Sequence, residues 1–206
     1  TELSSKLGRS KGGDLSDALN ELTQAGFLAR DYTWDLAQGK KAKSSRYRVC
    51  DNYLRFYLKY VHPYKEQIEA GKIRKLPPGW FSILGLQFEN LVVTNGSQLQ
   101  RLLEIPYDEI VFVGPYTQTT RTRRKGCQLD YLIQTRFHCL YVCEVKFKQA
   151  LIGVEIIEEV KKKLQTLQLP RGFSYRPVLI HVNGVDEAVA DSGFFSRIID
   201  FSDLLY

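Results

Sequence analysis

Apolar residues in the first fifty positions follow two successive patterns. Four of them recur at the spacing of an amphipathic helix: Leu15, Leu19, Leu22 and Phe27. Gly26 marks the end of this helix. Two strand-like runs follow at residues 27–34 and 46–49, separated by a polar basic loop at residues 38–45. The pattern predicts one helix followed by a two-stranded hairpin.

The next apolar residues are aromatic. A helix is predicted over residues 51–61, and its rings share one face. These rings are Tyr53, Phe56, Tyr57 and Tyr60. Such a stripe packs against a neighbouring domain or offers a platform on which nucleic-acid bases stack. The polar residues 64–75 and the sequence Pro77-Pro78-Gly79 then predict a boundary between two domains.

The chain beyond this boundary begins with a predicted helix at residues 80–94. It is apolar nearly all round, so we expect it to be buried. Between Leu76 and Gln100 the only ionisable side chain is Glu89. A lone carboxylate on a buried helix is costly unless it has a partner or a metal ion. A hydrogen bond from a backbone amide is the alternative.

Strand-like runs dominate the rest of the chain. They occupy residues 109–113, 128–134, 139–147 and 177–182. A helix at residues 154–167 separates the last two, with acids early and lysines late, as the helix dipole favours. We expect the pairs Glu158–Lys162 and Glu159–Lys163, with Lys161 to Lys163 as a solvated face. The order helix, three strands, helix, strand predicts a mixed α/β sandwich.

Composition narrows the class of protein. The 206 residues are 44% hydrophobic and 25% charged, as in globular proteins. No apolar run reaches about 18 residues and no signal peptide opens the chain, so we expect no membrane span and a cytoplasmic location. The excess of 29 Lys+Arg over 23 Asp+Glu, a net charge of +6, favours an anionic partner.

The first fifty residues have the element order of a winged helix-turn-helix, a small DNA-binding module. Residues 1–9 would be the remains of its preceding helix. The sequence contains no methionine, so we expect it to be a piece of a longer protein.

The four cysteines indicate no zinc site. Cys50, Cys127, Cys139 and Cys143 form no C-x-x-C pair. Cys139 and Cys143 are too far apart along one strand to share a zinc ion. We expect core thiols in a reducing cytosol.

Acidic and basic residues converge on two neighbouring strands. Glu144 and Lys146 share one strand face because side chains alternate, and the hairpin connection places Asp130 beside Glu144. Two carboxylates repel each other unless a divalent cation lies between them, and Mg²⁺ takes such oxygen ligands. Lys146 could orient water or stabilise charge on a phosphate, and Glu89 could complete the cluster. The alternative is a solvated strand face with a weak Glu144–Lys146 pair.

This ordered set resembles the PD-(D/E)xK nuclease superfamily, the restriction-endonuclease-like fold, whose core is an αβββαβ unit. Residues 47–56 and 85–92 resemble archaeal-type P-loop ATPases, in which an ATPase is followed by a winged helix and a nuclease-like domain. The resemblance implies an N-terminally truncated winged helix at residues 1–50, an aromatic helix and linker at 51–76, and a nuclease-like domain at 77–206.

The resemblance also implies roles for single residues. Asp130, Glu144 and Glu89 would form the site of a Mg²⁺ or Mn²⁺ ion, and Lys146 would be the catalytic lysine. The proline that usually precedes the first acid of the motif is absent, because Gln128-Leu129 precedes Asp130. No Gly-x-x-x-x-Gly-Lys-[Ser/Thr] motif occurs, so ATP would bind only to an upstream domain.

Three functions are consistent with these patterns. The first is a magnesium-dependent DNA endonuclease module of a larger ATPase, with DNA and the upstream ATPase domain as partners. The second is a catalytically inactive nuclease fold that binds DNA or regulates the ATPase. The third is a protein-interaction domain that uses the aromatic stripe. Basic residues expected to contact nucleic acid, or alternatively to form solubilising loops, are Lys40, Lys41, Lys43, Arg46, Arg121, Arg123, Arg124 and Lys125.

Overall fold

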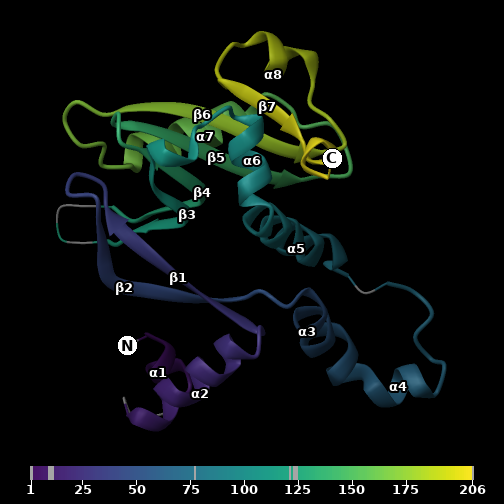
Figure 1. The fold of residues 1–206 in the computed structure, drawn as a ribbon. Helices are drawn as coiled ribbons and strands as arrows, with labels where there is room; N and C mark the ends of the chain where they lie inside the picture. Colours follow the sequence, from purple (N-terminus) through teal and green to yellow (C-terminus); the bar gives the residue numbers. More distant parts are fainter. Residues whose placement is uncertain (1, 9–11, 77, 121, 123–124, 206) are drawn as a thin grey trace. The chain divides into compact units, whose positions relative to one another are not determined.

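The fold is known from a computed structural model that describes residues 2–8, 12–76, 78–120, 122 and 125–205 (Figure 1). It is mixed α/β, as predicted. The described strands form a two-stranded sheet and a five-stranded sheet. The chain divides into two compact units. Unit 1 comprises Thr1–Arg30 and Arg46–Pro78, and unit 2 comprises Asp31–Ser45 and Gly79–Tyr206.

Unit 1 contains the predicted helix and the base of the predicted hairpin. Helix α1 spans Glu2–Lys6 and helix α2 spans Gly13–Gln24. Gly26, in the left-handed region with φ of 80°, ends α2 and lets the amide of Phe27 donate to the carbonyl of Leu22. The chain then enters the hairpin strands, β1 (Leu28–Asp35) and β2 (Lys40–Val49).

The predicted polar loop at residues 38–45 is mostly strand. Strand β2 begins at Lys40, so the connection between the strands is a short turn. Asp35 closes this turn, since its carboxylate accepts from the amide of Gln38 and its carbonyl accepts from the amide of Gly39. Gly39 has φ of 58°, which glycine adopts at little cost. The prediction of a loop was wrong, because basic side chains suit an exposed strand as well as a loop.

The aromatic segment of unit 1 is helical but not one regular helix. Helix α3 (Asn52–Phe56) begins at the Asp51 cap and continues as a π-helix (Tyr57–Val61), a 3₁₀ turn (His62–Tyr64) and α4 (Lys65–Glu69). The π-turn is wider than an α-helical turn, so the segment is less regular than the single helix that was predicted. The rings form two pairs, and Tyr53 is 68% exposed whereas Tyr60 is buried.

Unit 2 is built around the five-stranded sheet, whose order is β3-β4-β5-β6-β7. The first three strands are antiparallel neighbours, and β6 and β7 continue the sheet in parallel with β5. The strands are β3 (Ile110–Gln118), β4 (Cys127–Thr135), β5 (Cys139–Phe147), β6 (Ser174–Val182) and β7 (Arg197–Asp200). The helices are α5 (Trp80–Thr94), α6 (Gly96–Leu102), α7 (Glu155–Thr166) and α8 (Glu187–Asp191), with 3₁₀ turns at Tyr107–Glu109 and Phe201–Leu204.

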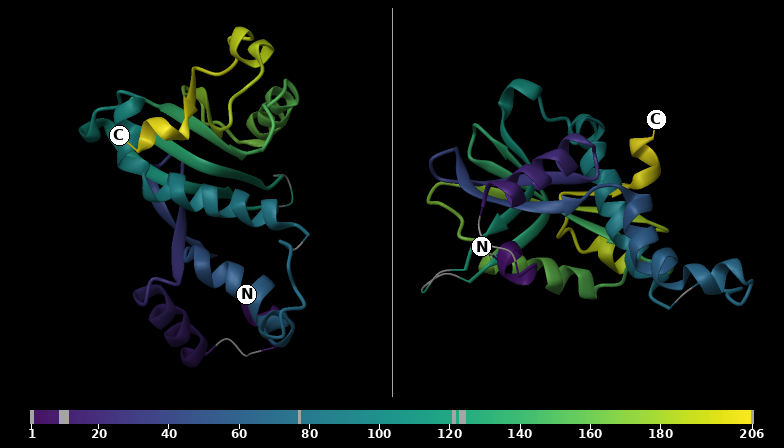
Figure 2. Two further views of the ribbon diagram at one scale, coloured as in Figure 1. Left: turned by 90° about the vertical axis from the view of Figure 1, so that its right-hand side faces the viewer. Right: turned by 90° about the horizontal axis from the view of Figure 1, so that it is seen from below.

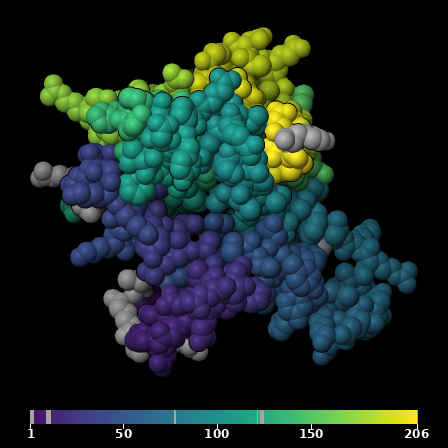
Figure 3. Space-filling view, in the orientation of Figure 1, coloured from purple at the N-terminus to yellow at the C-terminus, as the bar shows by residue number. Residues whose placement is uncertain are grey.

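Helices cover both faces of this sheet (Figure 2). Val92 of α5 packs with Val145 and Ile180 on one face. On the other face, Ile156 of α7 packs with Leu179. The space-filling view shows the teal residues of unit 2 as one continuous surface (Figure 3). The predicted αβββαβ order is confirmed, with helices α6 and α8 and strand β7 as unpredicted additions.

The helix predicted at residues 80–94 has the expected bounds but not the expected burial. Ile83, Phe88 and Val92 of α5 are buried, whereas Phe81 and Leu86 are exposed. Only one side of α5 meets the sheet of unit 2, so the expectation of a helix buried all round was wrong. No described helix is both long enough and apolar enough to cross a membrane.

The tip of the β1–β2 hairpin is part of the core of unit 2. Trp34, 4% exposed, stacks on Phe112 and meets the edge of Tyr116 at ring-centroid distances of 5.3 and 5.0 Å. Its indole Nε1 donates to Oε1 of Gln134 at 2.7 Å, and Nε2 of Gln134 donates to the carbonyl of Leu36 at 3.0 Å. The hairpin tip is therefore held by both apolar packing and buried hydrogen bonds.

The cysteines lie in the packed parts of the chain and form no disulfide with one another. Cys127 and Cys143 are buried, and Cys50 and Cys139 are partly buried. Burial raises the pKa of the Cys143 thiol well above its ordinary value, which keeps it protonated and unreactive.

Candidate active site

A bulge in β4 places Asp130 at the centre of the site. Gly114 pairs with Leu132 and Tyr116 pairs with Leu129, so Pro115 alone faces two residues of β4. Proline has no amide to donate and is tolerated at such an irregularity. Because of the extra residue, Leu129 and Leu132 lie on the same face of the sheet although they are three positions apart. Asp130 lies in the bent part of the strand between them.

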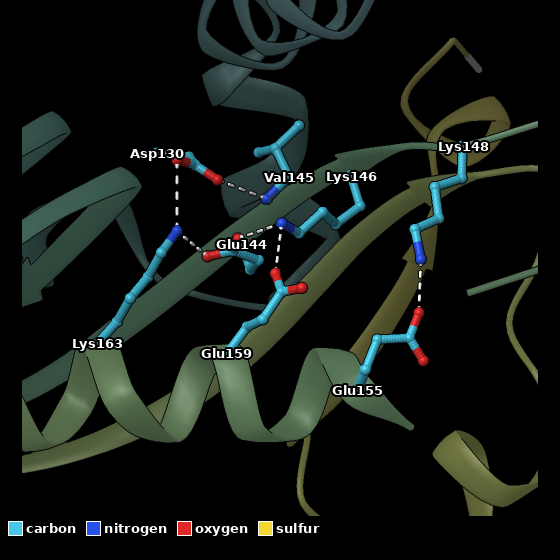
Figure 4. A network of polar contacts seen from close by, with 8 residues as sticks. All are labelled: Asp130, Glu144, Val145, Lys146, Lys148, Glu155, Glu159 and Lys163. Carbon is cyan, nitrogen blue, oxygen red and sulfur yellow. Dashed lines mark hydrogen bonds and ion pairs between the residues drawn. The ribbon is translucent and has the colours of Figure 1, made fainter. Parts of the chain in front are cut away.

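The carboxylate of Asp130 reaches the neighbouring strand. The register of β4 with β5 runs from Gln134 opposite Leu140 to Tyr131 opposite Cys143. Just beyond this, Oδ2 of Asp130 accepts a hydrogen bond at 3.0 Å from the backbone amide of Val145 (Figure 4). Asp130 thus binds β5 through its side chain, and its second oxygen points to the face that α7 covers.

Glu144 and Lys146 project from β5 toward α7, as their alternation predicts. Glu144 is 3% exposed, and two lysines contact it. Nζ of Lys146 lies 3.2 Å from Oε1, and Nζ of Lys163 lies 2.5 Å from Oε2. Lys163 also lies 3.8 Å from Oδ1 of Asp130. The predicted proximity of Asp130, Glu144 and Lys146 is therefore present in the structure.

Helix α7 contributes two residues that sequence reasoning did not place in the site. Lys163 binds Glu144 rather than Glu159, and Oε2 of Glu159 accepts from Nζ of Lys146 at 2.7 Å (Figure 4). Glu158 pairs with Lys161 at 2.8 Å. The predicted pairing of Glu159 with Lys163 was wrong because both side chains turn toward the sheet, where buried charges of opposite sign attract them more strongly than each other.

The electrostatics of the network follow from its burial. Burial raises the pKa of Asp130 to about 7, and the negative charge of Glu144 adds to this effect. The ammonium of Lys163 and the amide of Val145 oppose the shift. For Lys163, burial alone would lower the pKa, but the charges of Asp130 and Glu144 raise it above the ordinary value. Burial alone would also lower the pKa of Lys146, but the hydrogen bond to Glu159 and the charge of Glu144 raise it above the ordinary value.

Glu89 is close enough to affect the site but is not part of a three-ligand group. It lies partly buried on α5, and its negative charge contributes to the raised pKa of Asp130. Among the described residues, no three His, Cys, Asp or Glu side chains are grouped closely enough to hold a metal ion. The role of Glu89 as a third ligand therefore stays a prediction.

The carboxylate pair itself fits a hard divalent cation. Asp130 and Glu144 offer oxygen atoms that face one ammonium group, so a compact cation is already accommodated between them. Mg²⁺ commonly uses one or two carboxylates and keeps several waters. The donors present suit Mg²⁺ or Mn²⁺, and these two residues are the ones that would hold such an ion.

The predicted nucleic-acid contacts are divided between the two units. Lys40, Lys41 and Lys43 are exposed on the part of β2 that belongs to unit 2, and Nζ of Lys41 lies 3.4 Å from the ring centroid of Tyr32. Arg46 belongs to unit 1. Lys125 is exposed just before β4. Arg121, Arg123 and Arg124 lie outside the described residues.

Comparisons with known sequences give a limited match. No family model matches the sequence. An uncharacterized protein of Methanocaldococcus jannaschii is 28% identical over 99 residues, which are 47% of this chain and 22% of that protein. The chain thus matches only about a fifth of the length of this relative.

Three solved structures align with part of this chain. Protein VC1899 from Vibrio cholerae gives a TM-score of 0.42 at 16% identity, over 69% of this chain and 39% of that one. A repair endonuclease from Pyrococcus abyssi gives 0.34 at 12% identity, over 54% and 43%. Protein AF1548, of unknown function, gives 0.38 at 16% identity, over 54% and 59%. Similarities of this size carry no conclusion about activity.

Proposed function

We propose that unit 2 is a nuclease module that hydrolyses phosphodiester bonds of DNA with the help of Mg²⁺ or Mn²⁺, within a longer protein that contains an ATPase domain. The observation that carries the proposal is the convergence of Asp130 and Glu144 with Lys146 and Lys163 at one place on the sheet. Two acids that suit a metal ion, next to two cations that suit a phosphate, form the minimal set for this chemistry.

The two acids have distinct tasks in this proposal. Asp130 is fixed by the amide of Val145, so one of its oxygens is held toward Glu144. Glu144 is buried and fixed by its lysines. Together they would hold the cation, which, when bound, withdraws charge from a phosphate oxygen and lowers the pKa of a bound water.

Lys146 would act as a cation rather than as a base. Its ammonium is held by Glu144 and Glu159, and its pKa is raised above the ordinary value. It therefore keeps its proton at neutral pH. A fixed positive charge beside a phosphate stabilises the additional negative charge that develops in the transition state of hydrolysis.

The proposal is tested by removing each acid's charge while keeping its shape. Asp130→Asn and Glu144→Gln should each lower metal-dependent nicking of supercoiled plasmid DNA by about 100-fold or more, as expected when a positioned electrostatic group is lost. The matched control is Glu155→Gln, which removes the same charge from the exposed pair of Glu155 with Lys148. Nicking should require added Mg²⁺ or Mn²⁺ and stop in EDTA.

Undiminished nicking in both variants would refute the proposal. A specific observation supports a second function, a non-catalytic DNA-binding module. Lys146 and Lys163 both contact the buried carboxylate of Glu144, so side chains of the chain itself balance its charge. DNA binding in EDTA by a protein that never nicks DNA would favour this second function.

A further inference from the structure

Lys163 holds the position between the two proposed metal ligands. Its ammonium lies 2.5 Å from Oε2 of Glu144 and 3.8 Å from Oδ1 of Asp130. Figure 4 shows it reaching from α7 to both carboxylates. A divalent cation bound by the same oxygens would have to come within about 2.0–2.1 Å of them. Two cations cannot share this space, because their repulsion is not screened by water in a largely buried site.

We infer that Lys163 is a built-in competitor of the metal ion. It closes the carboxylate site at rest, and metal binding displaces its ammonium group. The inference rests on the proposed metal site, and it adds a regulatory step to that site.

The surroundings of Lys163 allow this displacement. Its side chain is 30% exposed and is therefore only partly enclosed by the protein. Lys146 also pairs at 2.7 Å with Glu159, which is not a proposed metal ligand, whereas both carboxylates that contact Lys163 are proposed ligands. Of the two lysines on Glu144, Lys163 is thus the one whose contacts a bound metal ion would replace. Once released, its charge is available to an anionic substrate beside the metal ion.

The first test measures displacement directly in the unaltered protein. The whole chain is treated briefly with an amine-acetylating reagent in EDTA or with saturating Mn²⁺, and labelling of each lysine is read by mass spectrometry. Lys163 should be labelled slowly in EDTA and severalfold faster with Mn²⁺. Lys161, on the same helix, pairs with exposed Glu158 and lies over the ring of Phe194; it is the internal control and should not change. Unchanged labelling of Lys163 at saturating Mn²⁺ would overturn the inference.

The second test measures competition through affinity. Lys163→Met keeps the aliphatic stem and removes the charge, and titration calorimetry should show Mn²⁺ binding about tenfold tighter or more, as loss of a neighbouring buried charge implies. Lys161→Met removes the same charge from the solvent side and should change affinity less than about twofold. If Lys163→Met folds poorly in EDTA, Lys163→Gln serves the same comparison.

The outcomes separate this inference from the proposed function. Equal Mn²⁺ affinity in the unaltered protein and in Lys163→Met would overturn the competition and leave the metal site intact. Absence of Mn²⁺ binding in both proteins would overturn the metal site itself, and the competition with it. Tighter binding in Lys163→Met but not in Lys161→Met supports both.

Discussion

His181 is a buried titratable residue in the described part of unit 2 that the proposed chemistry does not use. It lies on β6, is 6% exposed, and its Nδ1 has no hydrogen-bond partner among the described residues. Oδ2 of Asp200 is 3.8 Å away. Burial lowers the pKa of His181, although the charges of Asp200 and Asp203 oppose this effect. The folded protein therefore favours the neutral imidazole.

This burial predicts an acid-sensitive contribution to stability. Below the unfolded pKa of about 6.5 the unfolded chain binds a proton more readily than the folded chain does. The contribution of His181 is thus present above about pH 6.5 and is lost as the pH falls toward the lower folded-state value. In urea unfolding, His181→Leu should show a smaller loss of unfolding free energy between pH 8 and pH 5 than the unaltered protein. Identical losses would show that His181 is protonated equally in both states.

Single residues were predictable where a pattern assigned them to a face. Alternation on β5 placed Glu144 and Lys146 together, and the hairpin placed Asp130 beside them. Lys163 was missed because three consecutive lysines resemble a solvated surface. The available signal was spacing, since Lys163 continues the buried positions Ile156 and Val160 of α7. The bulge at Asp130 also left little trace in the sequence, apart from Gly114-Pro115 on the neighbouring strand.

At the scale of elements, the hairpin tip is predicted to be essential for the stability of unit 2. Trp34→Ala should lower the free energy of unfolding by about 3–5 kcal/mol, as for other buried aromatic truncations. Trp34→Phe keeps the ring packing but leaves Oε1 of Gln134 without its donor, which should cost about 1–3 kcal/mol. Urea denaturation measures both, and exposed Phe137→Ala should change stability by less than about 0.5 kcal/mol. A Trp34→Ala effect as small as this control would contradict the packing described here.

Elements were predictable where they were long and strongly patterned. Helix α5 and strand β5 have the predicted bounds, and β4 is only slightly longer than predicted. Strand β7 was not predicted, because a strand of four residues is too short to show an alternating pattern. It forms by parallel pairing with β6. The π-helix of unit 1 also could not be predicted, since a helical aromatic spacing does not reveal how wide the turn is.

At the scale of the whole molecule, the net charge of +6 predicts salt-dependent DNA binding. If the hairpin lysines contact phosphates, the double change Lys40→Ala and Lys43→Ala should weaken binding to duplex DNA and reduce the slope of log K against log salt by about 1–2. The double change Lys161→Ala and Lys162→Ala alters net charge equally and should leave the slope nearly unchanged. Fluorescence anisotropy across a salt series measures both. Equal effects of the two pairs would assign binding to net charge rather than to the hairpin.

The chain alternates between its two units, and this limits where it can be cut into fragments that fold. The chain passes from unit 1 to unit 2 after Arg30, returns after Ser45, and passes to unit 2 again after Pro78. Trp34 and Leu36 therefore pack in the same core as Leu129 and Leu132, which lie almost a hundred residues later in the sequence. A gene fragment that begins after Pro78 would encode an incomplete core. Unit 2 therefore has to be expressed together with residues 31–45, which the chain reaches only through unit 1.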